Sequence, residues 1–145
     1  MILLLVRHGE AEWNAKRRVM GRGSQKLTKR GQIQATQVAK ALQPHNVDYI
    51  YSSPITRACE TAAVIEAELG VPIQLSEMLV ELDAGQLEGL TSEEMQHRYP
   101  EFMALWKRDR VNADIPGGES LLHVEQRVDS FYRFVKKEHS YGNIV

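Results

Sequence analysis

The chain opens with a short apolar run that leads directly into a cluster of polar residues. Residues 2–6 are Ile-Leu-Leu-Leu-Val, and Arg7, His8, Gly9 and Glu10 follow without a spacer. An apolar run of this length, β-branched at both ends, predicts a buried strand of a parallel sheet. Open α/β sheets bind their ligands beyond the carboxyl ends of the strands. The polar tetrapeptide therefore lies where such a sheet would bind a ligand.

The chemistry of this tetrapeptide suits an anionic ligand that carries a phosphate. Arg7 offers a planar fork of donors that matches phosphate oxygens, and His8 is a nitrogen nucleophile or proton carrier. Gly9 allows a sharp turn and a close approach of a ligand to the main chain. Arg7 and His8 are therefore the first candidate site residues.

Composition limits the classes of protein and of site. The 145 residues predict one domain, residues 1–145. The formal net charge of −1 gives no reason to expect a nucleic-acid or membrane partner. The single cysteine, Cys59, excludes an internal disulfide and a zinc site built from several cysteines. The apolar start is too short for a signal peptide or a membrane span, so we expect a cytoplasmic location.

The rest of the chain alternates helical and strand patterns. Thr28 is a predicted N-cap, Ser53 with Pro54 predicts the start of another helix, and Thr91 with Glu94 forms a capping-box pattern. The predicted helices run from Thr28 to about Leu42, from Ser53 to about Leu69, from Thr91 towards Tyr99, over Phe102 to Trp106, and over Val124 to about His139. The predicted strands are Val47 to Tyr51, Ile73 to Leu75, and one that begins at Ile144.

A strongly basic stretch follows the His8 segment. It holds seven cations and no acid: Lys16, Arg17, Arg18, Arg22, Lys26, Lys29 and Arg30. The stretch could draw an anionic substrate towards Arg7 and His8, or it could be a solvated loop, and the pattern leaves both open. Binding of nucleic acid is a further alternative, but the near-neutral total charge and the lack of interleaved aromatic residues count against it.

A second motif follows the second predicted strand. Residues 52–58 read Ser-Ser-Pro-Ile-Thr-Arg-Ala, which places Arg57 in the first turn of a helix. Four further segments accompany it in a fixed order: Arg7 to Asn14, Leu27 to Gly31, Glu81 to Gly89, and Gly117 to Ser120. Together they resemble the histidine phosphatase superfamily, the group that includes the phosphoglycerate mutases, and the resemblance covers nearly the whole chain.

The resemblance implies a fold and a set of roles. The implied fold is α/β, a three-layer sandwich with a mostly parallel central sheet flanked by helices. His8 would be the nucleophile that forms a phosphohistidine, Glu81 the general acid and base, and Arg7, Asn14 and Arg57 the groups that bind the phosphoryl oxygens. The implied substrate is a small phosphorylated metabolite, and no metal or other cofactor is implied.

The chain departs from the family pattern at its C-terminal side. Family members carry a second active-site histidine, followed by glycine, directly after a strand that begins as Ile144-Val145 does. His45, His97, His123 and His139 lack that setting and are not assigned to the site. The expectation is a domain truncated before this histidine, without its C-terminal strand and helix. Such a truncation would leave residues 2–6 with an unpaired apolar edge.

The resemblance favours one activity and leaves others open. Mutase relatives usually carry a longer insertion between the carboxylate and the second histidine, so the modest segment after Glu81 favours a compact phosphatase of the broad-specificity or α-ribazole phosphatase type. A phosphoglycerate mutase is the alternative, and a non-catalytic phosphate-binding relative is another if Val145 is the native end. The expected partner is the phosphorylated substrate, with no nucleic acid and no membrane, and a homodimer is left open.

Overall fold

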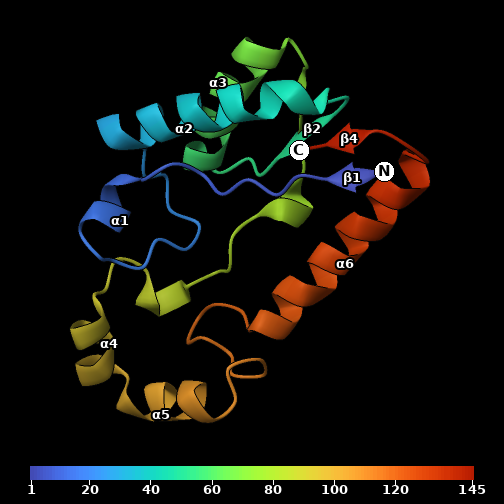
Figure 1. Cartoon of the computed structure of the whole chain (residues 1–145). Coiled ribbons are helices and arrows are strands. Elements are labelled where there is room, and N and C mark those ends of the chain that lie inside the picture. Colours follow the sequence, from blue (N-terminus) through green and yellow to red (C-terminus); the bar gives the residue numbers. More distant parts are fainter.

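Four short parallel strands form the centre of the computed structural model, which describes residues 1–145 (Figure 1). Strand β1 (Ile2–Leu3) pairs with β4 (Asn143–Ile144), and β2 (Ile50–Ser52) pairs with β3 (Ile73–Leu75). A parallel bridge between Tyr49 and Ile144 joins the two pairs, which gives the strand order β1-β4-β2-β3. The predicted parallel α/β arrangement is confirmed.

Helices cover the two faces of this sheet. Helices α2 (Lys29–Leu42) and α3 (Thr56–Leu69) pack against each other on one face, and α6 (Leu121–Glu138) lies on the other (Figure 1). The core on the α2 and α3 side is built from apolar residues that are all at least nine-tenths buried: Ala39, Leu42, Ile50 and Ile65. The expected three layers are therefore present.

Shorter elements extend the fold away from the sheet. They are α1 (Glu12–Ala15), η1 (Gln43–His45), η2 (Glu77–Leu79), η3 (Gly85–Leu87), α4 (Ser92–Arg98) and α5 (Pro100–Arg108). The amide of Glu94 donates to the Thr91 hydroxyl at 3.2 Å and the amide of Thr91 donates to the Glu94 carboxylate at 2.8 Å, which confirms the capping box. None of the helices is both long and apolar enough to cross a bilayer.

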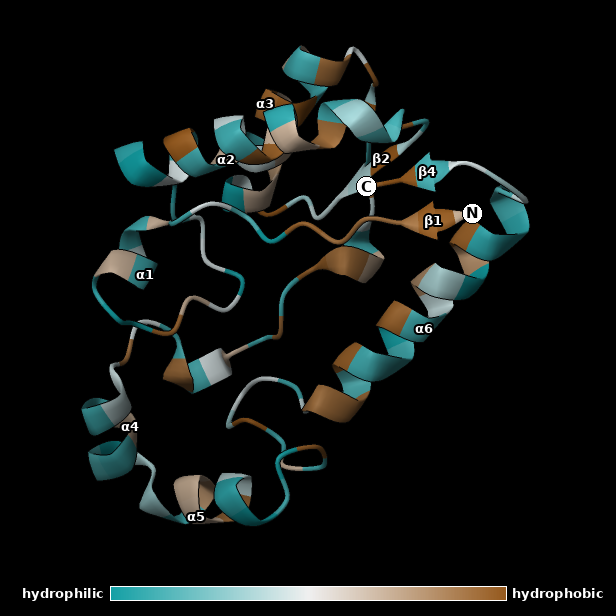
Figure 2. Cartoon of the chain, in the orientation of Figure 1, coloured by the Kyte–Doolittle hydropathy of each residue, from teal (hydrophilic) through white to brown (hydrophobic).

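A second apolar cluster supports the α4 and α5 region. Its buried members are Leu87, Leu90 and Ile115, and side chains of both helices pack against it. This cluster is separate from the core beneath α2 and α3. Figure 2 shows α4 and α5, the helices that pack against it, at the end of the molecule away from the strands.

The first strand differs from the prediction in length and burial. A buried strand over residues 2–6 is wrong, since β1 covers only Ile2–Leu3, both exposed, and Leu5 is 94% exposed. The predicted unpaired edge is also wrong at residues 2–4, because Ile2 donates to the Gly142 carbonyl at 2.9 Å and Leu4 to the Ile144 carbonyl at 2.7 Å. Strand β1 pairs with β4 on one side and has no strand on its other side, which agrees with its short length and its exposure.

The start of α3 also differs from the prediction. The helix begins at Thr56, and the preceding Ile55 is extended, with ψ of 137°. The Ser53 hydroxyl accepts a hydrogen bond from the Ile55 amide at 3.3 Å, so it closes a turn before the helix and caps none of its amides. Serine hydroxyls commonly stabilise such turns in place of a helix terminus. Arg57 remains in the first turn of α3, as predicted.

Two glycines bring α2 into direct contact with the loop that carries His8. The Thr28 hydroxyl accepts a hydrogen bond from the Gly31 amide at 3.1 Å, which confirms the predicted N-cap, and the Thr28 amide donates to the Glu10 carbonyl at 2.9 Å. A Cβ on Gly9 would overlap the Gly31 carbonyl, and a Cβ on Gly31 would overlap that of Glu10. Because neither residue has a side chain, the backbone of the His8 loop packs directly against the backbone at the start of α2.

We predict that Gly31→Ala lowers the free energy of unfolding by about 3 kcal/mol, because the new methyl group must displace backbone atoms. The matched control is Gly70→Ala at the C-terminus of α3, where φ is +70° and no atom lies within 4 Å of the added Cβ. Its left-handed backbone alone should cost about 1 kcal/mol. Chemical denaturation measures both, and equal losses would contradict the close packing of Gly31.

Candidate active site

His8 follows β1 after residues 4–7 and presents one ring nitrogen to Arg57. Its Nδ1 lies 2.7 Å from the Gly9 carbonyl oxygen, so Nδ1 carries a proton and donates to that oxygen. Nε2 then holds a lone pair, and it accepts a hydrogen bond from Nε of Arg57 at 3.2 Å. The main chain therefore selects the tautomer in which Nε2 is available as a nucleophile.

Arg57 is a buried cation surrounded by hydrogen-bond acceptors. Its side chain comes from the first turn of α3, and the residue is only 1% exposed. The guanidinium donates to the Gly21 carbonyl at 2.8 Å, to the Gly23 carbonyl at 3.2 Å and to His8. A buried charge is tolerated only when it is hydrogen-bonded, so these contacts bring the 21–23 segment and the His8 loop together around one group.

Charge and burial set the protonation of His8. Burial is the main cause that lowers the pKa of His8 below its ordinary value of 6.5, and the charges of Arg57 and Arg7 lower it further. The Gly9 hydrogen bond and the Glu81 charge act in the opposite direction without reversing the shift. His8 is therefore a neutral imidazole at pH 7, the form that a nitrogen nucleophile requires.

Glu81 joins the site through Arg57. It follows η2 in an irregular segment, and its side chain is 51% exposed. One carboxylate oxygen accepts the Leu82 amide at 2.8 Å, and the other lies 3.9 Å from Nη2 of Arg57. The structure thus places this carboxylate beside the cation that also contacts His8.

Arg7 and Asn14 lie at the two cavities that meet at His8. A cavity of about 620 Å³ is lined by Arg7, His8, Arg57 and Glu81 and by mostly apolar side chains of β1, β2 and α6. A second cavity of about 660 Å³, beside α2, is lined by Arg7, His8 and Asn14. The carbonyl oxygen of the Asn14 side chain accepts the Ala11 amide at 2.9 Å, which leaves its NH₂ group to donate to a ligand.

The structure therefore brings four of the five predicted residues to one cavity. Arg7, His8, Arg57 and Glu81 share it, and Asn14 lies on the other side of Arg7 and His8. None of His45, His97, His123 and His139 lines either cavity. The ring of His139 contacts the Tyr51 hydroxyl at 2.8 Å, which makes it a packing group beside β2.

Thr61 supports the site and was not among the predicted residues. It is 3% exposed, its hydroxyl accepts the Gly9 amide at 3.1 Å, and it donates to the Arg57 carbonyl at 2.8 Å. The hydroxyl therefore links the His8 loop to the turn of α3 that carries Arg57. The available signal was its spacing, because residues four apart share one face of a helix and Thr61 interrupts an otherwise apolar face.

Part of the basic stretch is paired with acids. Arg18 contacts Glu94 at 2.9 Å and Arg30 contacts Glu10 at 3.7 Å. Arg22 contacts two acids, Glu119 at 3.2 Å and Asp83 at 3.4 Å. Three of the seven cations thus tie the stretch to neighbouring segments, and the attraction of an anionic substrate by the others stays a prediction.

Comparisons with known proteins agree with this geometry. The family model of the histidine phosphatase superfamily (branch 1) matches residues 3–145. Phosphoserine phosphatase 1 of Hydrogenobacter thermophilus is 36% identical over 137 residues, which are 94% of this chain and 65% of that protein. A Salmonella choleraesuis protein named "Probable phosphoglycerate mutase GpmB" is 38% identical over 133 residues, which cover 86% of this chain and 58% of that protein. The chain thus spans less than two thirds of the length of these curated relatives.

A solved structure extends the likeness to three dimensions. The crystal structure of the alpha-ribazole phosphatase from Shigella flexneri superposes with a TM-score of 0.90 at 29% identity, over 99% of this chain and 71% of that one. The fold of the chain therefore agrees with that of a known phosphatase structure.

We predict that Arg7→Gln raises the pKa of His8 towards 6.5, because it removes one of the charges that disfavour the imidazolium. NMR titration of the His8 ring protons measures this shift. Lys107→Gln on α5 is the matched control, since it removes an exposed cation far from His8 in the sequence and outside both cavities. An unchanged His8 pKa in Arg7→Gln would contradict the electrostatic assignment.

The same shift predicts a dependence of stability on pH. Because the pKa of His8 is lower in the folded chain than the unfolded value of 6.5, the unfolded state binds the proton more readily. The contribution of His8 to stability is therefore present above pH 6.5 and is lost as the pH falls through the folded pKa. Denaturation from pH 7.5 to about pH 5 should show a smaller loss in Arg7→Gln than in the unmodified chain.

Proposed function

Because this chain belongs to the histidine phosphatase superfamily, branch 1, we propose that it hydrolyses phosphate monoesters of small metabolites through a phosphohistidine on His8. The observation that supports this most directly is the unprotonated Nε2 of His8, held 3.2 Å from the guanidinium of a buried arginine. A nucleophile and a fixed cation at this separation can act on one phosphoryl group, the first as attacking atom and the second as ligand of its oxygens.

In the first step, Nε2 of His8 attacks phosphorus in line with the ester oxygen. The N–P bond forms and the bond between phosphorus and the ester oxygen breaks. Arg7 and Arg57 would neutralise the phosphoryl oxygens, and the NH₂ group of Asn14 would add a hydrogen bond. The Nε–H of Arg57, which donates to His8 in the free site, would transfer its hydrogen bond to a phosphoryl oxygen as the imidazole lone pair is used.

Glu81 would supply the proton that the leaving oxygen needs. One of its oxygens accepts the Leu82 amide, so the other is the oxygen available to transfer a proton. In the second step, water attacks the phosphohistidine, Glu81 accepts the water proton, and inorganic phosphate leaves as the N–P bond breaks.

The mutase alternative uses the same phosphohistidine and differs in the acceptor. It is supported by the phosphoglycerate mutase name of the Salmonella relative, whereas the names of the Hydrogenobacter and Shigella proteins support a phosphatase. In a mutase, the phosphohistidine transfers its phosphoryl group to a second sugar-acid hydroxyl, and in a phosphatase it transfers it to water. Release of inorganic phosphate without exchange between 2- and 3-phosphoglycerate would support the phosphatase, and rapid exchange would overturn it.

We also propose a cytoplasmic location and no nucleic-acid partner. The location follows from the proposed substrates, which are small phosphorylated metabolites. The formal net charge of −1 and the pairing of three cations of the basic stretch with acids leave little charge for a polyanion.

We predict that His8→Ala abolishes both phosphate release and ³²P labelling of the protein from a labelled phosphomonoester, because no other nitrogen in the cavity can form the intermediate. The control is His97→Ala on α4, an exposed histidine outside both cavities, which should leave labelling unchanged. Labelling that survives in His8→Ala would remove His8 as the nucleophile. Measurable phosphate release by the unmodified chain would exclude the non-catalytic alternative.

A further inference from the structure

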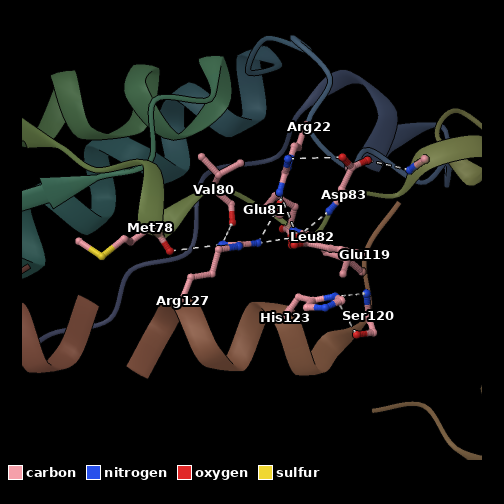
Figure 3. Close-up of polar contacts among 12 residues, drawn as sticks. Arg22, Met78, Val80, Glu81, Leu82, Asp83, Glu119, Ser120, His123 and Arg127 are labelled. Atoms are coloured by element: carbon pink, nitrogen blue, oxygen red, sulfur yellow. Dashed lines mark hydrogen bonds and ion pairs between the residues drawn. The ribbon is translucent and has the colours of Figure 1, made fainter. Parts of the chain in front are cut away.

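A polar network centred on Arg127 contacts the main chain of Glu81 and of the residues before it (Figure 3). Arg127 extends from α6 and donates to the carbonyl oxygens of Met78 at 3.2 Å, Val80 at 2.5 Å and Glu81 at 3.3 Å. It also donates to the Glu119 carboxylate at 2.6 Å. The Arg127 side chain, which is 19% exposed, thus contacts the main chain of Glu81 and of two residues just before it.

Glu119 holds the main chain on the other side of Glu81. The carboxylate oxygen that contacts Arg127 also accepts the Asp83 amide at 2.9 Å and Arg22 at 3.2 Å, and the Glu119 amide donates to the Asp83 carbonyl at 3.1 Å. Burial by itself would raise the pKa of Glu119, but the hydrogen bonds from Arg127 and the Asp83 amide, with the charges of both arginines, lower it. Glu119 is therefore a carboxylate at neutral pH.

These contacts matter because residues 80–84 belong to no helix or strand. The side chain of Glu81 is half exposed, and its polar contacts are its neighbour's amide and Arg57 at 3.9 Å. A half-exposed side chain with these two polar contacts owes much of its position to the main chain that carries it. Its position relative to His8 therefore depends on the main chain, which Arg127 holds at residues 78, 80 and 81 and Glu119 holds at residue 83.

We propose that Arg127 and Glu119 form a positioning pair that fixes Glu81 as the general acid. The inference rests on the proposed function, and neither residue needs to touch the substrate. Arginine suits the task because its planar fork reaches three carbonyls and a carboxylate at once, which the single nitrogen of lysine cannot do. A small displacement of an acid from its proton acceptor lowers the rate of proton transfer even when the fold is intact.

The test compares two phosphate donors that differ in their need for an acid. Nitrophenolate leaves without protonation, whereas the serine alkoxide of phosphoserine needs the proton from Glu81. In single-turnover measurements of phosphohistidine formation, Arg127→Gln should slow the reaction of phosphoserine about tenfold more than that of p-nitrophenyl phosphate. Arg127→Lys should recover part of this selective loss, and Glu119→Gln should show a smaller loss in the same direction.

The matched control is Arg133→Gln on the same helix. Arg133 pairs with Asp129 at 2.8 Å on an exposed face, so its removal changes the charge of α6 equally without touching the Glu81 segment. Arg133→Gln should leave the rate of phosphohistidine formation unchanged with both donors. Circular dichroism tests the folding of each variant, and if Arg127→Gln is unfolded, Arg127→Lys and Glu119→Gln carry the comparison.

A double variant separates positioning from general weakening of the fold. In a Glu81→Gln background, Arg127→Gln should cause no further selective loss with phosphoserine, because the acid is already absent. Equal losses with both donors, or a selective loss that persists without Glu81, would overturn the positioning role alone. An unmodified chain that forms no phosphohistidine with either donor would overturn the proposed function, and this inference with it.

Discussion

The burial of one positive charge determines how the site is assembled. The Arg57 guanidinium is almost fully removed from solvent, so each of its donors must find an acceptor inside the protein. Two glycine carbonyls and the His8 ring accept three hydrogen bonds from it, and each comes from a segment without regular structure. The guanidinium therefore joins the 21–23 segment to the His8 loop.

Two arginines from opposite faces of the sheet contact the residues of the candidate site. Arg57, from α3, contacts His8 directly and approaches the Glu81 carboxylate. Arg127, from α6, contacts the main chain around Glu81. Because the two helices lie on different faces of the sheet, their relative placement affects the distance between His8 and the Glu81 carboxylate (Figure 1). The layered fold thus holds helix residues such as Arg57 against the loop residues His8 and Glu81.

Local patterns predicted the helices well, because caps and helical periodicity depend on neighbours in sequence. Thr28 and the Thr91 capping box are such cases. The roles of the candidate site residues came from the resemblance to a family, since residues such as His8 and Glu81 are distant in the sequence and no local pattern relates them. The length of β1 was predicted poorly, because a strand persists only where another strand or a helix covers it. The Arg127 network carried no readable signal, since three of its acceptors are main-chain carbonyls, which every sequence contains.

The pairing of β1 with β4 has a consequence for how the chain reaches its folded state. Ile2 and Leu3 pair with Asn143 and Ile144, which are made much later than they are. Closing a loop of about 140 residues costs roughly 4 kcal/mol of chain entropy, which local helix formation cannot offset. During synthesis, α2 and α3 can pack early, whereas β1 must wait for the distant strand. The segment that carries His8 is therefore expected to be among the last to become ordered.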